Sequence, residues 1–144
     1  EELIDFTQAY TPADPSSYLG LDADLDVEGA VIAAQTGTIQ ASFVADQGWT
    51  VVEFATPEET LAAVRNGEAD AVLADKSFLN SALEGQSDLV MRAREEAIGG
   101  GVAMGVRQSD TELRDAFDAE IQSMKDDGTL NTLIEKWEVA STFE

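Results

Sequence analysis

The stretch GAVIAAQTGTIQ, residues 29–40, decides the fold. Its first half, residues 29–34, is a continuous apolar run of the kind that is buried in a parallel sheet. The run stops at polar residues and Gly37, and the pattern then predicts a helix over residues 38–46. A strand that leads into a helix N-terminus presents free backbone N–H groups and the positive end of the helix dipole, which together attract anions. Capping of the helix by the Thr38 hydroxyl is the alternative interpretation.

The same alternation continues along the chain. Strands are expected at residues 49–54 and 70–75, and a helical pattern follows each of them. The first of these helices is the best marked, because Thr56 can cap it, Pro57 suits its first turn and Glu59 completes a capping box. Alternating strands and helices predict a parallel, Rossmann-like α/β unit. Ligands of such sheets bind at the carboxyl ends of the strands, where residues 35–38 and Asp75 are expected.

The remaining elements lie toward the two ends of the chain. Short strands are expected at residues 3–6, 18–22 and 88–93, and another follows three consecutive glycines at 99–101. Two helices come last, and the first is expected to begin with a capping box of Ser109 and Glu112. The side chains that form the expected apolar faces of these two helices are Leu113, Phe117, Ile121, Met124, Leu130, Leu133, Ile134 and Trp137. In the helix over residues 38–46, the expected inner face consists of Ile39, Phe43 and Val44.

Composition excludes several classes of function. The 144 residues are enough for a compact unit, and 44% of them are apolar, so the chain can form a core. The net charge of −21 argues against partners that are anionic, namely nucleic acid and acidic membrane surfaces. The sequence has no histidine and no cysteine, which excludes His-dependent triads and the common zinc sites. No catalytic pair stands out among the many acidic residues, so we expect no enzyme, metal or cofactor.

Two chemical preferences meet at the predicted edge of the sheet. The backbone donors from Gly37 to Gln40 suit a carboxylate or a phosphate, but no glycine-rich nucleotide signature accompanies them. Asp75 suits an ammonium group, although it can equally be the N-cap of the helix that follows. An anion site beside a cation site fits a zwitterion such as an amino acid.

Four stretches, in this order, resemble the type II periplasmic solute-binding proteins of ABC importers. The resemblance is to the polar amino-acid branch, which binds lysine, arginine, ornithine, histidine or glutamine. The stretches are LIDFTQAYTPADPSSYLG (3–20), GAVIAAQTGTIQASFV (29–44), RNGEADAVLAD (65–75) and the region from GGGVAMGV to EKW (99–137). The fold that the resemblance implies is α/β of the periplasmic-binding-protein type II kind. It has a mostly parallel, Rossmann-like sheet flanked by helices, together with inter-lobe hinge strands.

The resemblance also implies a domain plan. Residues 1–19 are similar to the first crossing between the family's two lobes, and residues 20–98 to the second, ligand-binding lobe. Residues 99–144 are similar to the return crossing and the C-terminal helices of the first lobe. The family's sequence for the N-terminal part of that lobe is not matched, so the sequence is expected to be a fragment. The fragment is then expected to dimerise, to bind a hydrophobic dye, or to lose order after about Gly101.

The ligand-binding residues that the resemblance implies are Gln35, Gly37, Thr38, Ile39, Gln40 and Asp75. Thr38 and the neighbouring backbone are expected to hold the ligand's α-carboxylate, and Asp75 its α-ammonium. Ile39 departs from the family, which has a second threonine at that position, so the carboxylate contact is expected to depend on the backbone.

The function implied is that of a periplasmic binding component of an ABC importer. It passes a polar amino acid unchanged to the membrane permease subunits, and the acidity of the chain favours a basic one. It is not an enzyme, requires no cofactor and does not insert in the membrane. Two other functions remain open at this point: a sensory lobe of a receptor or cell-wall enzyme with the same fold, and a plain structural or interaction domain.

Overall fold

The computed structural model describes residues 3–84, 88–137, 139–140 and 142–143. The chain divides into two compact units. One is the continuous segment Pro15–Gly99, which we call the central unit. The other combines Glu1–Asp14 with Gly100–Glu144, and we call it the terminal unit.

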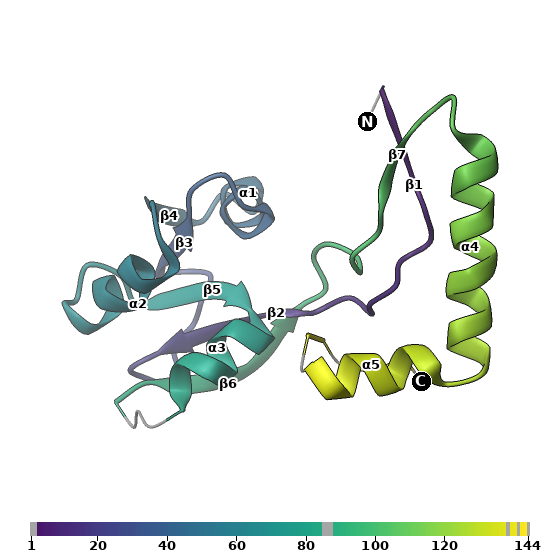
Figure 1. Ribbon diagram of the computed structural model, residues 1–144. Coiled ribbons are helices and arrows are strands. Elements are labelled where there is room, and N and C mark those ends of the chain that lie inside the picture. The colour runs from purple at the N-terminus through teal and green to yellow at the C-terminus, as the bar shows by residue number, and fades with distance from the viewer. Residues whose placement is uncertain (1–2, 85–87, 138, 141, 144) are drawn as a thin grey trace. The chain divides into compact units, whose positions relative to one another are not determined.

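A five-stranded sheet forms the middle of the central unit (Figure 1). Its strands, in spatial order, are β4 (Thr50–Phe54), β3 (Val31–Gln35), β5 (Ala71–Asp75), β2 (Ser16–Gly20) and β6 (Val90–Glu96). Strand β3 pairs in parallel with β4 and β5, as the alternating pattern predicted. Strand β2 pairs antiparallel with both β5 and β6, so it is the one strand that runs against the other four.

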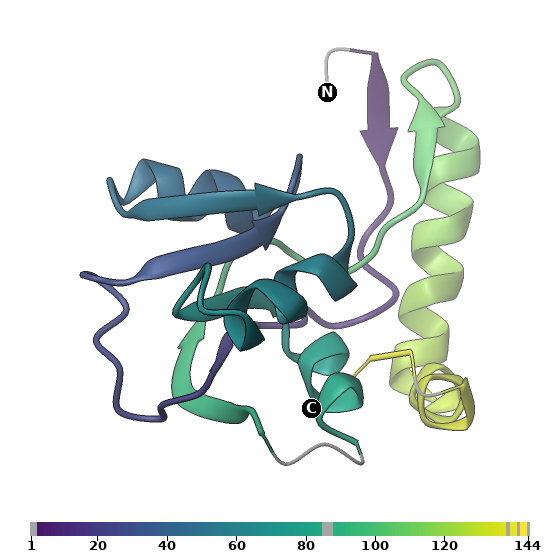
Figure 2. The same cartoon turned by 90° about the vertical axis from the view of Figure 1, so that its left-hand side faces the viewer.

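Helices cover both faces of this sheet, which explains the continuous apolar runs in its strands. Helix α1 (Ile39–Asp46) packs on one face, and helices α2 (Pro57–Arg65) and α3 (Lys76–Leu83) pack on the other (Figure 2). Tyr18 and Leu19 are neighbours in β2 and both are fully buried, but they belong to the cores of opposite faces. This follows from the alternation of side chains along a strand.

The capping box predicted for α2 is confirmed. The Thr56 hydroxyl accepts a hydrogen bond from the Glu59 N–H, and the Glu59 carboxylate accepts one from the Thr56 N–H. Pro57 is the first helical residue, and Gly67, with a φ of 75°, follows the last turn. The left-handed conformation at Gly67 is one that glycine adopts at little cost.

Two expectations for the central unit were wrong in part. Ser16 and Ser17 lie before the strand expected at residues 18–22, but they begin β2 and are buried between β5 and β6. Of the inner face expected for α1, Val44 is buried and Phe43 is half-buried against the same core, but Ile39 is 53% exposed, and Gln40 and Ala41 are buried instead. Partners that are distant in the sequence explain both differences, because hydrogen bonding allows a polar side chain to be buried.

The terminal unit is built around a two-stranded antiparallel sheet of β1 (Ile4–Phe6) and β7 (Gly105–Arg107). Beyond the strands the two segments stay together, because the Thr7 and Thr11 hydroxyls accept hydrogen bonds from the backbone N–H groups of Met104 and Val102. A side chain at Gly101 would collide with the Thr11 carbonyl oxygen, so a glycine is required there.

Helices α4 (Thr111–Asp126) and α5 (Thr129–Trp137) complete the terminal unit. The capping box expected at Ser109 and Glu112 was wrong, because Asp110 occupies the N-cap position and makes no side-chain capping bond. Its carboxylate instead pairs with Arg107 at 2.9 Å and accepts a hydrogen bond from the Ser109 hydroxyl. No helix in the described part of the chain is long and apolar enough to cross a membrane.

Candidate functional site

The predicted site lies where β3 and β5 end at the same edge of the central sheet. These two strands are parallel neighbours, and Ala33 lies opposite Val72. Gln35 is the last residue of β3 and Asp75 is the last residue of β5. Residues forty positions apart in the sequence therefore come together, as the strand pattern predicted.

The turn between β3 and α1 leaves backbone donors at this edge. Gly37 has a φ of 76°, and Thr38 has extended backbone as the N-cap of α1. The Thr38 hydroxyl accepts from the Ala41 N–H at 3.3 Å and donates to the Gln35 carbonyl at 2.7 Å. The N–H groups of Ile39 and Gln40 are the first two of the helix, so no carbonyl of the helix can accept from them. They are the donors best placed to bind an anion.

The Asp75 carboxylate is held by a side chain of α1. Gln40 Nε2 donates to Asp75 Oδ1 at 2.6 Å and to Ser16 Oγ at 3.1 Å. Asp75 is the N-cap residue of α3, but its side chain makes no capping bond to that helix. The capping alternative considered for Asp75 therefore does not describe how its side chain is used in this structure.

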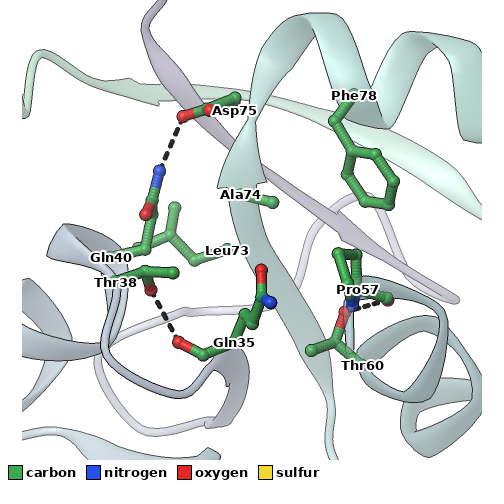
Figure 3. Close-up of a pocket in the computed structure, with 9 residues that line it drawn as sticks. All are labelled: Gln35, Thr38, Gln40, Pro57, Thr60, Leu73, Ala74, Asp75 and Phe78. Carbon is green, nitrogen blue, oxygen red and sulfur yellow. Dashed lines mark hydrogen bonds between the residues drawn. The ribbon is translucent and has the colours of Figure 1, made fainter. Parts of the chain in front are cut away.

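A pocket of about 230 Å³ opens at the same place (Figure 3). Its lining consists of Gln35, Thr38, Gln40, Pro57, Thr60, Leu73, Ala74, Asp75 and Phe78. Four of the six residues predicted for the site line the pocket, while Gly37 and Ile39 are not part of the lining. Gly37 shapes the turn, and Ile39 has its exposed side chain beside Gly99.

Sequence reasoning missed the apolar side of this pocket. Pro57 and Phe78 lie in the first turns of α2 and α3, and Ala74 lies just before the end of β5. The Thr60 hydroxyl donates to the Pro57 carbonyl at 2.6 Å, so its hydrogen is already used within α2. The available signal was positional: helix starts that follow neighbouring parallel strands lie at the same edge as the strand ends.

The lining of the pocket carries a negative charge, because Asp75 is the one charged residue among those that line it. The cations of the central unit are engaged with other groups: Arg65 with Asp88, Lys76 with Glu95, Arg94 with Glu96 and Arg92 with the Asp22 carbonyl. The hydrogen bond from Arg65 lowers the pKa of the Asp88 carboxyl below its ordinary value. Within the described ranges, no cluster of three or more acidic side chains is arranged to hold a metal ion.

The fold and the site define a two-unit α/β protein with a small pocket, part apolar and part polar, at the edge of a sheet. Residues 1–140 match the family model of bacterial extracellular solute-binding proteins, family 3, and the chain belongs to that family. The periplasmic-binding-protein type II fold expected from the sequence, with its mostly parallel sheet and flanking helices, is confirmed by this match and by the structures below.

Three relatives illustrate the match. The putative ABC transporter arginine-binding protein 2 of Escherichia coli K12 is 26% identical over 117 aligned positions, and the match covers 77% of this chain and 48% of that protein. A periplasmic His/Glu/Gln/Arg/opine family-binding protein from Silicibacter pomeroyi, solved in complex with lysine, is 54% identical with a TM-score of 0.81. The similarity covers 99% of this chain and 66% of that one.

The third is an amino acid ABC transporter substrate-binding protein from Streptococcus pneumoniae bound to L-arginine. It is 27% identical with a TM-score of 0.73, over 94% of this chain and 60% of that protein. The chain thus spans about half the length of the curated relative and up to two thirds of these solved ones.

Proposed function

We propose that this chain is the ligand-binding part of an extracytoplasmic protein that delivers a free polar amino acid to an ABC importer. The observation that carries the proposal is the pairing of opposite preferences at one pocket. The first backbone N–H groups of α1 have no acceptor within the helix, and the Asp75 carboxylate is hydrogen-bonded to the Gln40 side chain of the same helix turn. A free α-amino acid carries both charges within a few bonds of each other, and a nucleotide or a simple anion does not.

In this proposal the ligand's α-carboxylate binds to the N–H groups of Ile39 and Gln40. The Thr38 hydroxyl contributes by shaping the turn, since its hydrogen is donated to the Gln35 carbonyl. The α-ammonium group binds to Asp75. No chemical step is required of the protein, because delivery changes only where the ligand is.

The pocket supports a preference for a basic amino acid. Its Asp75 carboxylate is not balanced by any cation in the lining, so an acidic ligand side chain would meet only like charge. Pro57, Ala74 and Phe78 offer an apolar surface on which a methylene chain can lie. The lysine and arginine in the solved relatives agree with this preference but belong to those proteins.

The domain plan proposed here takes residues 20–98, with β2 completing their sheet, as one lobe of a two-lobed binding protein. Residues 1–19 and 99–144 supply the two crossings and the helices that belong to the other lobe. Closure of the two lobes on the ligand is the change that permease subunits would recognise outside the cytoplasmic membrane.

A thermal-shift screen of the twenty amino acids on the protein in its full natural length tests this proposal. Arginine and lysine are expected to raise the unfolding midpoint most, because ligands that bind the folded state stabilise it by mass action. Glutamate serves as the matched control for size and polarity, and its shift should be the smaller. If none of the twenty changes the midpoint, the protein is not an amino-acid carrier.

A further inference from the structure

Gln40 lines the pocket from α1, and it is a buried polar residue. The residue is 6% exposed, and it lies on the inner side of the helix, where an apolar residue was expected. A buried amide is costly unless it is hydrogen-bonded. Both hydrogens of its Nε2 are used, one for Asp75 Oδ1 at 2.6 Å and one for Ser16 Oγ at 3.1 Å (Figure 3 shows the bond to Asp75).

These two bonds join three elements of the central unit. Gln40 belongs to α1, Ser16 begins β2 and Asp75 ends β5. Ser16 is fully buried and lies directly opposite Asp75 in the antiparallel pairing of β2 with β5. The amide is therefore anchored at a fixed point of the sheet while it holds the carboxylate.

The same residue also takes part in the anion half of the site. Its backbone N–H is the second of α1, and it has no acceptor within the helix. The backbone N–H of Gln40 therefore belongs to the proposed carboxylate site, while its side chain holds Asp75, the residue proposed to bind the ammonium group. Few side chains are long enough to reach from the first turn of one helix to the end of a neighbouring strand.

We propose that Gln40 is a positioning residue that fixes the Asp75 carboxylate at the distance from the α1 N–H groups that an α-amino acid requires. This inference rests on the proposed function. Gln40 acts on the ammonium group through Asp75, and in this proposal its side chain does not contact the ligand. The benefit is preorganisation: a carboxylate already held in its binding orientation loses less freedom when the ligand arrives.

The test is calorimetry with L-arginine and L-lysine on the protein in its full natural length. Gln40→Met keeps the length of the side chain and removes both donors, and we expect affinity to fall about tenfold or more, as for a lost hydrogen bond to a charged group. Gln47→Met is the matched control, because Gln47 lies on the exposed C-cap of the same helix. It should change affinity less than about twofold.

A double-mutant cycle separates positioning from general damage to the fold. If Gln40 acts through Asp75, then adding Gln40→Met to an Asp75→Ala protein should weaken binding less than about twofold further. If Gln40→Met costs the same factor in both backgrounds, or costs no more than Gln47→Met, the inference is wrong. Gln40→Asn, which withdraws the same amide by one methylene, replaces Gln40→Met throughout if the methionine variant does not fold.

The ligand itself supplies a second readout. Lysine and 6-aminohexanoate share the carboxylate and the distal ammonium, but the second lacks the α-ammonium. Gln40→Met should lower the preference for lysine over 6-aminohexanoate about tenfold, whereas an unchanged preference would contradict positioning. A wild-type protein that binds no amino acid would refute the proposed function instead, and the two failures are thereby distinguished.

Discussion

The central and terminal units differ in how much apolar surface they bury. Among the described residues, every buried apolar side chain belongs to the central unit except Ile121, Leu130 and Ile134. The terminal unit exposes most of the large apolar side chains that are exposed: Leu3, Ile4, Phe6, Val102, Leu113, Phe117, Leu133, Trp137 and Val139. An amphipathic pattern thus shows that a surface is suited to burial. In the central unit, other elements of the same unit bury that surface, whereas in the terminal unit much of it stays exposed.

The largest expected difference is in hydrogen exchange of the 144-residue chain. Backbone amides of β3 and β5 should exchange at least about a hundredfold more slowly than those of α4 and α5, because local opening is easiest where few apolar contacts form. Binding of a hydrophobic dye should come from the terminal unit. Equal protection of both units, with no dye binding, would remove the contrast.

Two leucine substitutions sharpen the comparison. Leu19 is fully buried in β2, whereas Leu133 in α5 is 39% exposed. Leu19→Ala should lower the free energy of unfolding by about 2–5 kcal/mol, as is usual when a cavity is created in a core. Leu133→Ala should cost less than about 1 kcal/mol in the same chemical denaturation experiment. A comparable loss at Leu133 would mean that α5 is covered in solution.

Binding should also distinguish the units, because the pocket residues all belong to the central one. Asp75→Ala should weaken arginine or lysine binding by roughly 2–4 kcal/mol, since the ammonium group loses its charged partner. Asp126→Ala removes the same charge from the terminal unit and should leave the calorimetric affinity unchanged. If both substitutions have the same effect, long-range charge rather than contact explains the binding.

The smallest expected effect concerns one N–H group. Ile39 is the first residue of α1, a position where proline is well tolerated, and the extended backbone of Thr38 suits a following proline. Ile39→Pro should therefore preserve the unfolding midpoint and weaken amino-acid binding by about 1.5 kcal/mol. Ile39→Ala keeps the N–H and is the control for loss of the side chain. Full affinity in the proline variant would contradict the backbone anion site.

Local chemistry was enough to predict much of the central unit. The apolar run at residues 29–34, the capping box at Thr56 and the glycine after α2 each act within a few residues, and each is found where the sequence placed it. The meeting of Gln35 with Asp75 followed from the rule that parallel strands end at one edge. These signals are strong because the physical cause lies within the segment that carries them.

The differences arise where the cause is distant. The sequence around Ser16 and Ser17 did not predict a strand, because their hydrogen-bond partners are strands that come much later in the chain. Gln40 was not expected inside because its burial depends on Asp75, thirty-five residues away. Asp110 replaced Ser109 at the N-cap of α4, with its carboxylate engaged by Arg107. Local propensity cannot anticipate a partner that only tertiary structure provides.

The continuity of the central unit bears on the order in which a ribosome would complete the two units. Every residue of that unit lies in one stretch, Pro15–Gly99, so its sheet can close as soon as β6 has emerged. Strand β1 is synthesised before β2 to β6, and it gains its partner only when β7 emerges, about a hundred positions later. During translation β1 therefore stays unpaired while the whole central unit is made, and its exposed side chains Ile4 and Phe6 are accessible to a chaperone throughout that interval.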